Sequence, residues 1–244
     1  MRVFALRIVP LILTGCVLIA AMPSAMGERL VACEQFTKTA VVSPAPRDDP
    51  HSLDRLAAIN AAIRAEPHPV LFLGDSITER WTLQIWKQDF APLGGLNAGI
   101  DGDRTEHLLW RLDHGNLDGT PPKVIVLLIG TNDLGHGRPP EVAAEGIRSD
   151  LIHLRERLPG VHVLLLGLTP RSDRFREKVI AVNRLIKTCD GGSIQYANIG
   201  NTLLDGQRRL TRTMSLDGVH FTDVGYKLLT RQLIPLIDAL LPRR

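Results

Sequence analysis

The sequence lacks any dense run of basic residues interleaved with aromatic residues, and aromatic residues make up only 5% of the chain. The formal net charge is +3. Arg2 and Arg7 lie in the segment Met1–Gly27, which has no acidic residue, so the rest of the chain carries 27 basic against 26 acidic side chains, or +1. Proteins that bind nucleic acid usually carry a strong basic patch. The composition therefore argues against nucleic acid as a partner.

Cysteine is also scarce, with three residues in the whole chain. If the N-terminal segment is removed, only Cys33 and Cys189 remain, and no histidine motif accompanies either of them. A catalytic role for a thiol is therefore not indicated. In an oxidising compartment the two cysteines can form a disulfide, and the alternative is two unpaired thiols. Distance along the sequence does not decide between these alternatives.

The segment Met1–Gly27 has the layout of a secretory signal peptide. Arg2 and Arg7 precede an apolar stretch from Ile8 to Met22, and small residues follow. We expect cleavage after Gly27, which predicts an exported protein, periplasmic or secreted. Two alternatives rank below it. Leu13-Thr14-Gly15-Cys16 resembles a lipobox, which would make a lipoprotein acylated at Cys16, and an uncleaved membrane anchor is disfavoured because the apolar run is short.

The remaining chain is predicted to form an N-terminal arm, residues 28–50, and one globular domain, residues 51–244. A chain of 244 residues with 44% hydrophobic content can bury a substantial core. No internal repeat or low-complexity segment is found.

Short apolar runs alternate with helical patterns through this domain. The pattern predicts strands at Val70–Leu73, Leu96–Ala98, Val124–Ile129, Val161–Leu168 and Ile194–Ala197. It predicts helices over 51–65, 76–90, 104–112, 140–158, 172–188 and 222–241. Strands that alternate with helices indicate an α/β fold with a parallel sheet and helices on both faces.

Ser76 follows the first strand in Gly74-Asp75-Ser76. The carboxyl ends of parallel strands meet at one edge of a sheet, where open α/β folds bind their ligands. A serine hydroxyl needs a nearby base to act as a nucleophile. His220 can be that base, with Asp217, three residues earlier, orienting its ring. The structural alternatives are a helix-capping pair at Asp75 and Ser76 and a solvated turn at 217–220.

Serine chemistry on a carbonyl also needs donors for the oxyanion. The N–H groups of Ser76 and Gly102 and the side-chain amide of Asn132 can supply three. Gly99, the first glycine of the same turn, is the nearest alternative to Gly102 for this role. Taken singly, Gly102 is equally consistent with a glycine that a turn requires for its positive φ, and Asn132 with a side-chain amide that caps a helix. The presence of all these residues in this order favours the catalytic interpretation.

These motifs resemble the ordered blocks of the SGNH (GDSL) hydrolases from about Ala65 to the C-terminus. The blocks are Gly74-Asp75-Ser76, Gly102, Gly130-Thr131-Asn132-Asp133 and Asp217-Gly218-Val219-His220. Asn97–Thr105, Leu109–Leu112, Pro122–Val126, Arg176–Lys178 and Asn183 are most similar to the α-subunit type of platelet-activating-factor acetylhydrolase. The resemblance implies a flavodoxin-like three-layer α/β/α sandwich with a mainly parallel five-stranded sheet. It also implies metal-free ester hydrolysis without a cofactor.

The resemblance assigns Ser76 as nucleophile, His220 as base, Asp217 as its orienter, and Gly102 and Asn132 as oxyanion donors. It implies Gly102 rather than Gly99, because Gly102 directly precedes Asp103-Arg104-Thr105, where the family has its Gly-Asp pattern. We therefore expect an exported serine esterase that removes short acyl groups, acetyl in the first place, from a small-molecule, glycan or lipid ester. Two alternatives are an acyltransferase on the same triad and a non-catalytic glycan- or lipid-binding relative. A homodimer is left open.

Asp101 departs from the resemblance, because the α-subunit type usually has glycine there. This difference bears on the substrate preference rather than on the chemistry.

Overall fold

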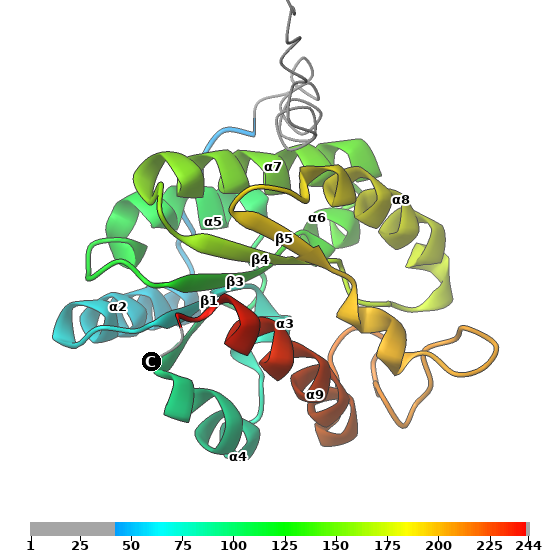
Figure 1. The fold of residues 1–244 in the computed structure, drawn as a ribbon. Coiled ribbons are helices and arrows are strands. Elements are labelled where there is room, and N and C mark those ends of the chain that lie inside the picture. The colour runs from blue at the N-terminus through cyan, green and yellow to red at the C-terminus, as the bar shows by residue number, and fades with distance from the viewer. Residues whose placement is uncertain (1–41, 243–244) are drawn as a thin grey trace, which may run out of the picture.

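Five parallel strands form the centre of the structure, a computed structural model that describes residues 42–242 (Figure 1). The strands are β1 (Val70–Gly74), β2 (Gly95–Gly99), β3 (Val124–Leu128), β4 (His162–Leu166) and β5 (Ile194–Ala197). Their order in the sheet is β2-β1-β3-β4-β5, and every neighbouring pair is parallel. The predicted five-stranded α/β fold is confirmed.

Helices cover both faces of this sheet. They are α2 (Pro50–Ala65), α3 (Ser76–Glu79), α4 (Leu83–Ile85), α5 (Thr105–Arg111), α6 (Thr131–Gly135), α7 (Pro140–Arg157), α8 (Arg176–Ile186) and α9 (Asp223–Leu240). Shorter 3₁₀ or π segments are η1 (Trp86–Phe90), η2 (Ala91–Leu93), η3 (Leu112–Asn116), η4 (Asp173–Phe175), η5 (Lys187–Cys189) and η6 (Ile199–Leu203). Figure 1 shows α5, α7 and α8 on one side of the sheet and α3, α4 and α9 on the other.

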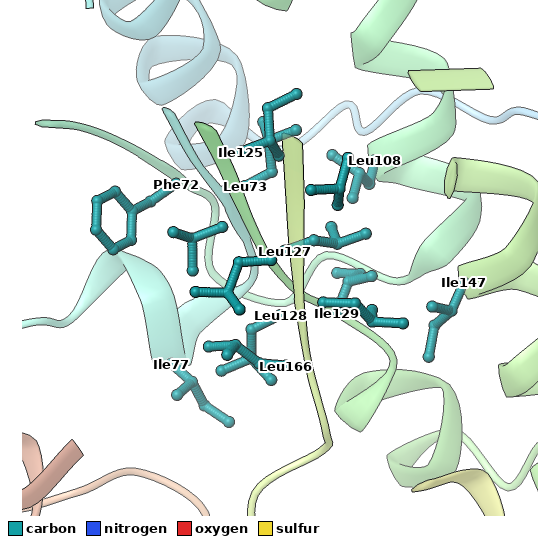
Figure 2. Packing of buried hydrophobic residues seen from close by; sticks show 14 of the residues in the cluster. Phe72, Leu73, Ile77, Leu108, Ile125, Leu127, Leu128, Ile129, Ile147 and Leu166 are labelled. Carbon is teal, nitrogen blue, oxygen red and sulfur yellow. The ribbon is translucent and has the colours of Figure 1, made fainter. Parts of the chain in front are cut away.

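The core is built on the fully apolar strands β1 and β3. All five residues of β3, Val-Ile-Val-Leu-Leu, are buried, as expected for a parallel strand covered on both faces. In Figure 2, Phe72 and Ile77 pack on one side of the sheet, and Leu108 and Ile147 pack on the other. Apolar side chains are therefore buried on both faces of the sheet.

The register of the sheet brings three chain turns to one edge. Gly74, the last residue of β1, lies opposite Gly99 of β2 and Leu128 of β3. The turns that follow these adjacent strands therefore start side by side. They carry Ser76, Gly102 and Asn132.

The predicted continuous helix over 76–90 is wrong. The chain forms α3, α4 and η1 in succession, and Thr82 is extended, with ψ of 138°. The Asn97 amide on β2 donates to the carbonyl oxygen of Thr78 at 2.7 Å, at the C-terminal end of α3. The turn that follows buries Trp81, whose indole N–H donates to Thr230 Oγ1 at 3.0 Å. The local sequence pattern cannot show these contacts, because they involve segments that are distant along the chain.

The N-terminal predictions fall largely outside the described residues, because Cys16, Cys33 and the segment 1–41 are not described. Cys189 is buried and forms a disulfide, which excludes a free thiol at that position. Its pairing with Cys33 stays a prediction. Within residues 42–242, no helix is long and apolar enough to cross a membrane.

Candidate active site

Ser76 is the first residue of α3, directly at the carboxyl end of β1. Asp75 caps this helix by accepting the Ile77 N–H at 2.9 Å. A Cβ at Gly74 would overlap the Thr78 side chain and the carbonyl oxygen of Leu128, so only glycine allows this tight strand-to-helix turn. Burial raises the pKa of Asp75 to about 7, and its second carboxylate oxygen has no partner in the structure.

His220 and Asp217 lie on the loop before α9, and they reach Ser76 across the edge of the sheet. His220 Nδ1 is 2.6 Å from Asp217 Oδ2, and His220 Nε2 is 2.9 Å from Ser76 Oγ. An ionised carboxylate only accepts, so Nδ1 carries the proton and Nε2 accepts from the Ser76 hydroxyl. The three side chains form one hydrogen-bond chain in the order that a serine nucleophile requires.

The loop itself holds Asp217 in the ionised form. Partial burial raises the pKa of Asp217, but hydrogen bonds from the His220 ring and from the N–H groups of Val219 and His220 outweigh burial and lower it to about 2. The two N–H donors lie 2.8 Å from Oδ1. Asp217 is therefore negatively charged at neutral pH, and it can stabilise a positive charge on His220.

Gly102 lies in the turn after β2, at a φ of 79° that favours glycine. Within the described residues, the N–H groups of Gly102 and Ser76 donate to no other group, so both are available to a ligand. The Asn132 amide lies beside this turn because its Nδ2 donates to the carbonyl oxygen of Asp103 at 2.9 Å. The second Nδ2 hydrogen is left for another acceptor. The structure thus brings the three predicted donors to the same edge as Ser76.

A buried arginine on α5 connects these turns. The Arg111 guanidinium donates to Asp103 Oδ2 at 2.8 Å and to the carbonyl oxygen of Gly74 at 2.9 Å, and it also bonds the Asn116 side chain. The Arg111 and Asp103 side chains are almost fully buried. A buried guanidinium with five donors needs several acceptors. Here those acceptors are the end of β1 and the turn after β2.

A second buried carboxylate connects the turns after β2 and β3. Asp133, next to Asn132, accepts from the N–H and the hydroxyl of Thr105 at 3.2 and 2.9 Å. Arg138 donates to the same carboxylate at 2.8 Å. These bonds hold the Asn132 turn against the start of α5.

The sequence motifs contained Asp103 and Arg111 but gave them no role. A signal was available for Arg111, because it lies on the apolar face of its helix between Leu108 and Leu112. Arg47, in the predicted arm, was missed altogether. Its Nη1 lies 3.2 Å from the carbonyl oxygen of Asp101 and stands over Gly102. Arg47 therefore packs on the turn that carries Gly102, from outside the predicted domain.

The Asp101 carboxylate forms an ion pair with the Arg80 guanidinium, at a distance of 2.6 Å. The carboxylate that distinguishes this chain from the α-subunit type is thus partly neutralised. Across residues 42–242, no group of three or more histidine, cysteine, aspartate or glutamate side chains is arranged to hold a metal ion.

Comparison with known proteins agrees with this geometry. Residues 72–228, more than half of the chain, match the GDSL-like lipase/acylhydrolase family. Platelet-activating factor acetylhydrolase IB subunit alpha2 of Rattus norvegicus is 35% identical over 178 residues, which cover 70% of this chain and 77% of that protein. The alpha1 subunit of Homo sapiens is 34% identical over 178 residues, which cover 70% and 76%.

Solved structures show the same fold. A GDSL-like lipase from Bacteroides thetaiotaomicron superposes with a TM-score of 0.65 at 23% identity, covering 77% of this chain and 98% of the lipase. A Streptococcus pneumonia protein superposes with a TM-score of 0.69 at 24% identity, covering 78% and 93%. With its family match, its curated relatives and its fold in agreement, the chain belongs to the GDSL-like lipase/acylhydrolase family and is an ester hydrolase.

Proposed function

We propose that this ester hydrolase is an exported serine esterase that releases short acyl groups, acetyl in the first place, through an acyl-enzyme on Ser76. The observation that carries the mechanism is the hydrogen-bond chain from Asp217 through His220 to Ser76, with distances of 2.6 and 2.9 Å. Each hydrogen bond in this chain has the direction that activates the serine hydroxyl.

In the first half-reaction, Ser76 Oγ attacks the ester carbonyl while its proton passes to His220 Nε2. The ionised Asp217 stabilises the imidazolium that forms. His220 then gives the proton to the leaving alcohol oxygen, the carbon–oxygen bond breaks, and the acyl group stays on Ser76. A water molecule then gives a proton to the same histidine and attacks the acyl carbon. The bond to Ser76 Oγ breaks, His220 returns the proton to Oγ, and the acid is released.

The negative charge of each tetrahedral intermediate falls on the former carbonyl oxygen. The N–H groups of Ser76 and Gly102 and the Asn132 amide are the donors for this oxygen. Because buried Arg111 and Asp133 hold their turns, these donors need little reorganisation when the charge develops.

Two observations support a short acyl group. The curated relatives are acetylhydrolase subunits by name. The Asp101–Arg80 ion pair lies beside the turn that carries Gly102. A long alkyl chain packed against this pair would strip water from two charges, which is unfavourable.

The mutational test of the nucleophile uses two single variants and their combination. Ser76→Ala should lower kcat for p-nitrophenyl acetate at least about 10³-fold in a folded protein, because no other group can form the acyl-enzyme. His220→Ala should cost a similar amount. The double variant should lose little more than either single variant, because the two residues act as a unit. Full activity of Ser76→Ala would contradict the mechanism.

Replacement of the side-chain oxyanion donor should separate catalysis from stability. Asn132→Ala should lower kcat about 10²–10³-fold with little change in KM, since the donor acts on the transition state. The lost bond to Asp103 should also lower the free energy of unfolding by about 1 kcal/mol. Asn132→Asp should be at least as damaging, because it opposes a developing negative charge.

Thr131→Val is the matched control for this pair, because the Thr131 hydroxyl is buried without a partner. It should leave kcat unchanged. Kinetics and thermal melting are measured on the same preparations. An Asn132→Ala protein that melts early but turns over normally would show that Asn132 is only a structural cap.

The acyl preference is measured with p-nitrophenyl esters of increasing chain length. Acetyl and propionyl esters should have a higher kcat/KM than the octanoyl ester, because the Asp101–Arg80 pair flanks the acyl side. Asp101→Gly should reduce the difference in kcat/KM between the short esters and the octanoyl ester. A clear preference of the wild type for octanoyl esters would indicate a lipase-like enzyme instead.

Export is proposed from the signal-like segment Met1–Gly27. Expression in a bacterial host that exports proteins, followed by intact mass measurement, should give a mature chain that begins at Glu28. A retained Met1 would contradict export by cleavage, and a lipid on Cys16 would identify a lipoprotein.

A further inference from the structure

A cavity of about 540 Å³ lies beside the loop that carries Asp217 and His220. Its walls come from α8, from the turns that follow β4 and β5, and from the segment after η6. Figure 1 shows α8 and this segment (orange) at the same end of the sheet, beyond β4 and β5. Ser76, His220 and Asp217 are not among the residues that line it.

The cavity is strongly cationic. Five of its lining residues are basic and one is acidic: Arg171, Arg176, Arg184, Lys187 and Arg208 against Asp173. Asp173 is already paired with Arg176 at 2.6 Å. Within residues 42–242, the other four cations form no close ion pair with a carboxylate, and Asp75 and Asp217 act on the charge of Arg171 from farther away. Unneutralised charges of one sign around a concave surface raise the local concentration of the opposite ion.

Arg171 joins this cavity to the catalytic centre. Its guanidinium donates to the carbonyl oxygen of Thr131, directly before Asn132, and lies 4.2 Å above the Phe175 ring. Its Nε is buried without a partner. The next residue, Ser172, donates its N–H to the carbonyl oxygen of Gly218 at 2.9 Å, inside the loop between Asp217 and His220. The rim of the cavity is therefore hydrogen-bonded to the loop that carries Asp217 and His220.

Arg208 is held in an unfavourable backbone conformation at the cavity. Its φ is 58°, and it is the one non-glycine residue with positive φ among residues 42–242. Asp205 stabilises this turn, since its carbonyl oxygen accepts the Arg208 N–H at 2.8 Å and its carboxylate accepts from Gln207 and Arg209. Residues other than glycine seldom adopt this conformation, and it recurs at functional sites. Glycine would remove the strain but also the cation.

The remaining wall is largely apolar, with Leu168, Val179, Ile180, Leu204 and Leu210. A ligand that fits therefore carries an anionic head group on an apolar body. The position of the cavity also indicates which part of an ester it receives. His220 must protonate the leaving alcohol oxygen, and the cavity adjoins the loop that carries His220, whereas the Asp101 turn lies on the opposite side, beyond β1.

We propose that this cavity is a subsite for an anionic group, phosphate or carboxylate, on the alcohol part of the ester substrate. The proposal rests on the proposed function. It makes esters with a negatively charged leaving group the preferred substrates of this enzyme.

The test compares matched acetyl esters. Acetoxyalkyl phosphates with spacers of two, four and six carbons are set against the acetoxyalkanols of the same length. At the best spacer, the wild-type kcat/KM should be at least about tenfold higher for the phosphate. Arg184→Gln/Lys187→Gln should reduce this ratio about tenfold.

Arg208→Gly should reduce the same ratio severalfold without lowering the melting temperature, because glycine accepts the positive φ. The matched control is Arg64→Gln/Lys123→Gln, which removes two exposed cations near the amino edge of the sheet. It should leave the ratio unchanged. An equal fall in the control would show a general effect of net charge and overturn the proposal.

Direct binding separates this proposal from the esterase assignment. Calorimetry should detect hexyl phosphate and heptanoate binding to the wild type, weaker binding of inorganic phosphate, and loss of the hexyl phosphate signal in Arg184→Gln/Lys187→Gln. If the acetoxyalkanols are hydrolysed but the ratio is near one at every spacer and hexyl phosphate does not bind, the subsite is refuted and the esterase stands. If no ester is hydrolysed but hexyl phosphate binds, the cavity binds anions and the proposed function fails.

Discussion

The buried Arg111–Asp103 ion pair is the constraint on which the geometry of the site depends. One guanidinium contacts the last residue of β1 and the turn after β2, and the carbonyl oxygen of Asp103 holds the Asn132 amide from the turn after β3. Three adjacent strand ends are thereby tied together. Removing one partner of such a buried pair leaves an uncompensated charge and costs roughly 3–5 kcal/mol, so the arrangement has few alternatives.

In the proposed mechanism, this constraint allows a small set of groups to stabilise the developing negative charge. The N–H groups of Ser76 and Gly102 donate to no group within residues 42–242, and the Asn132 amide has one bond to spare. Donors that are fixed in advance stabilise an oxyanion without reorganisation, and this electrostatic effect is usually the largest in acyl transfer. The loop that carries Asp217 and His220 is held in place by other contacts. It is held by its own turn at Asp217 and by the bond between Ser172 and Gly218.

Much of this architecture could be predicted from local sequence. Val124–Ile129 predicts a buried strand because no polar residue interrupts it, and β3 ends one residue earlier. The motif residues Ser76, Asp217 and His220 could be selected because their chemistry is distinctive, and the structure brings them within hydrogen-bond distance. Information of this kind is local in the chain or shared with relatives.

The parts that could not be predicted depend on contacts between distant segments. The break after α3 follows from Asn97 on another strand, and the contact of Arg47 with the Gly102 turn follows from the path of the arm. Arg111 reads in sequence as an arginine on a helix, and only the fold shows that it is buried. The cationic cavity gathers residues from 168 to 210 whose charges are scattered along the sequence.

In the proposed mechanism, Ser76 is the residue that carries the acyl group. Rapid quenching of the wild type with p-nitrophenyl acetate, followed by proteolysis and mass spectrometry, locates that group directly. We expect one acetyl group on the peptide that contains Ser76, formed within the burst of p-nitrophenol and absent from the Ser76→Ala protein. An acetyl group found on another residue with the same burst kinetics, or turnover with no acyl-enzyme under conditions where deacylation limits the rate, would contradict it.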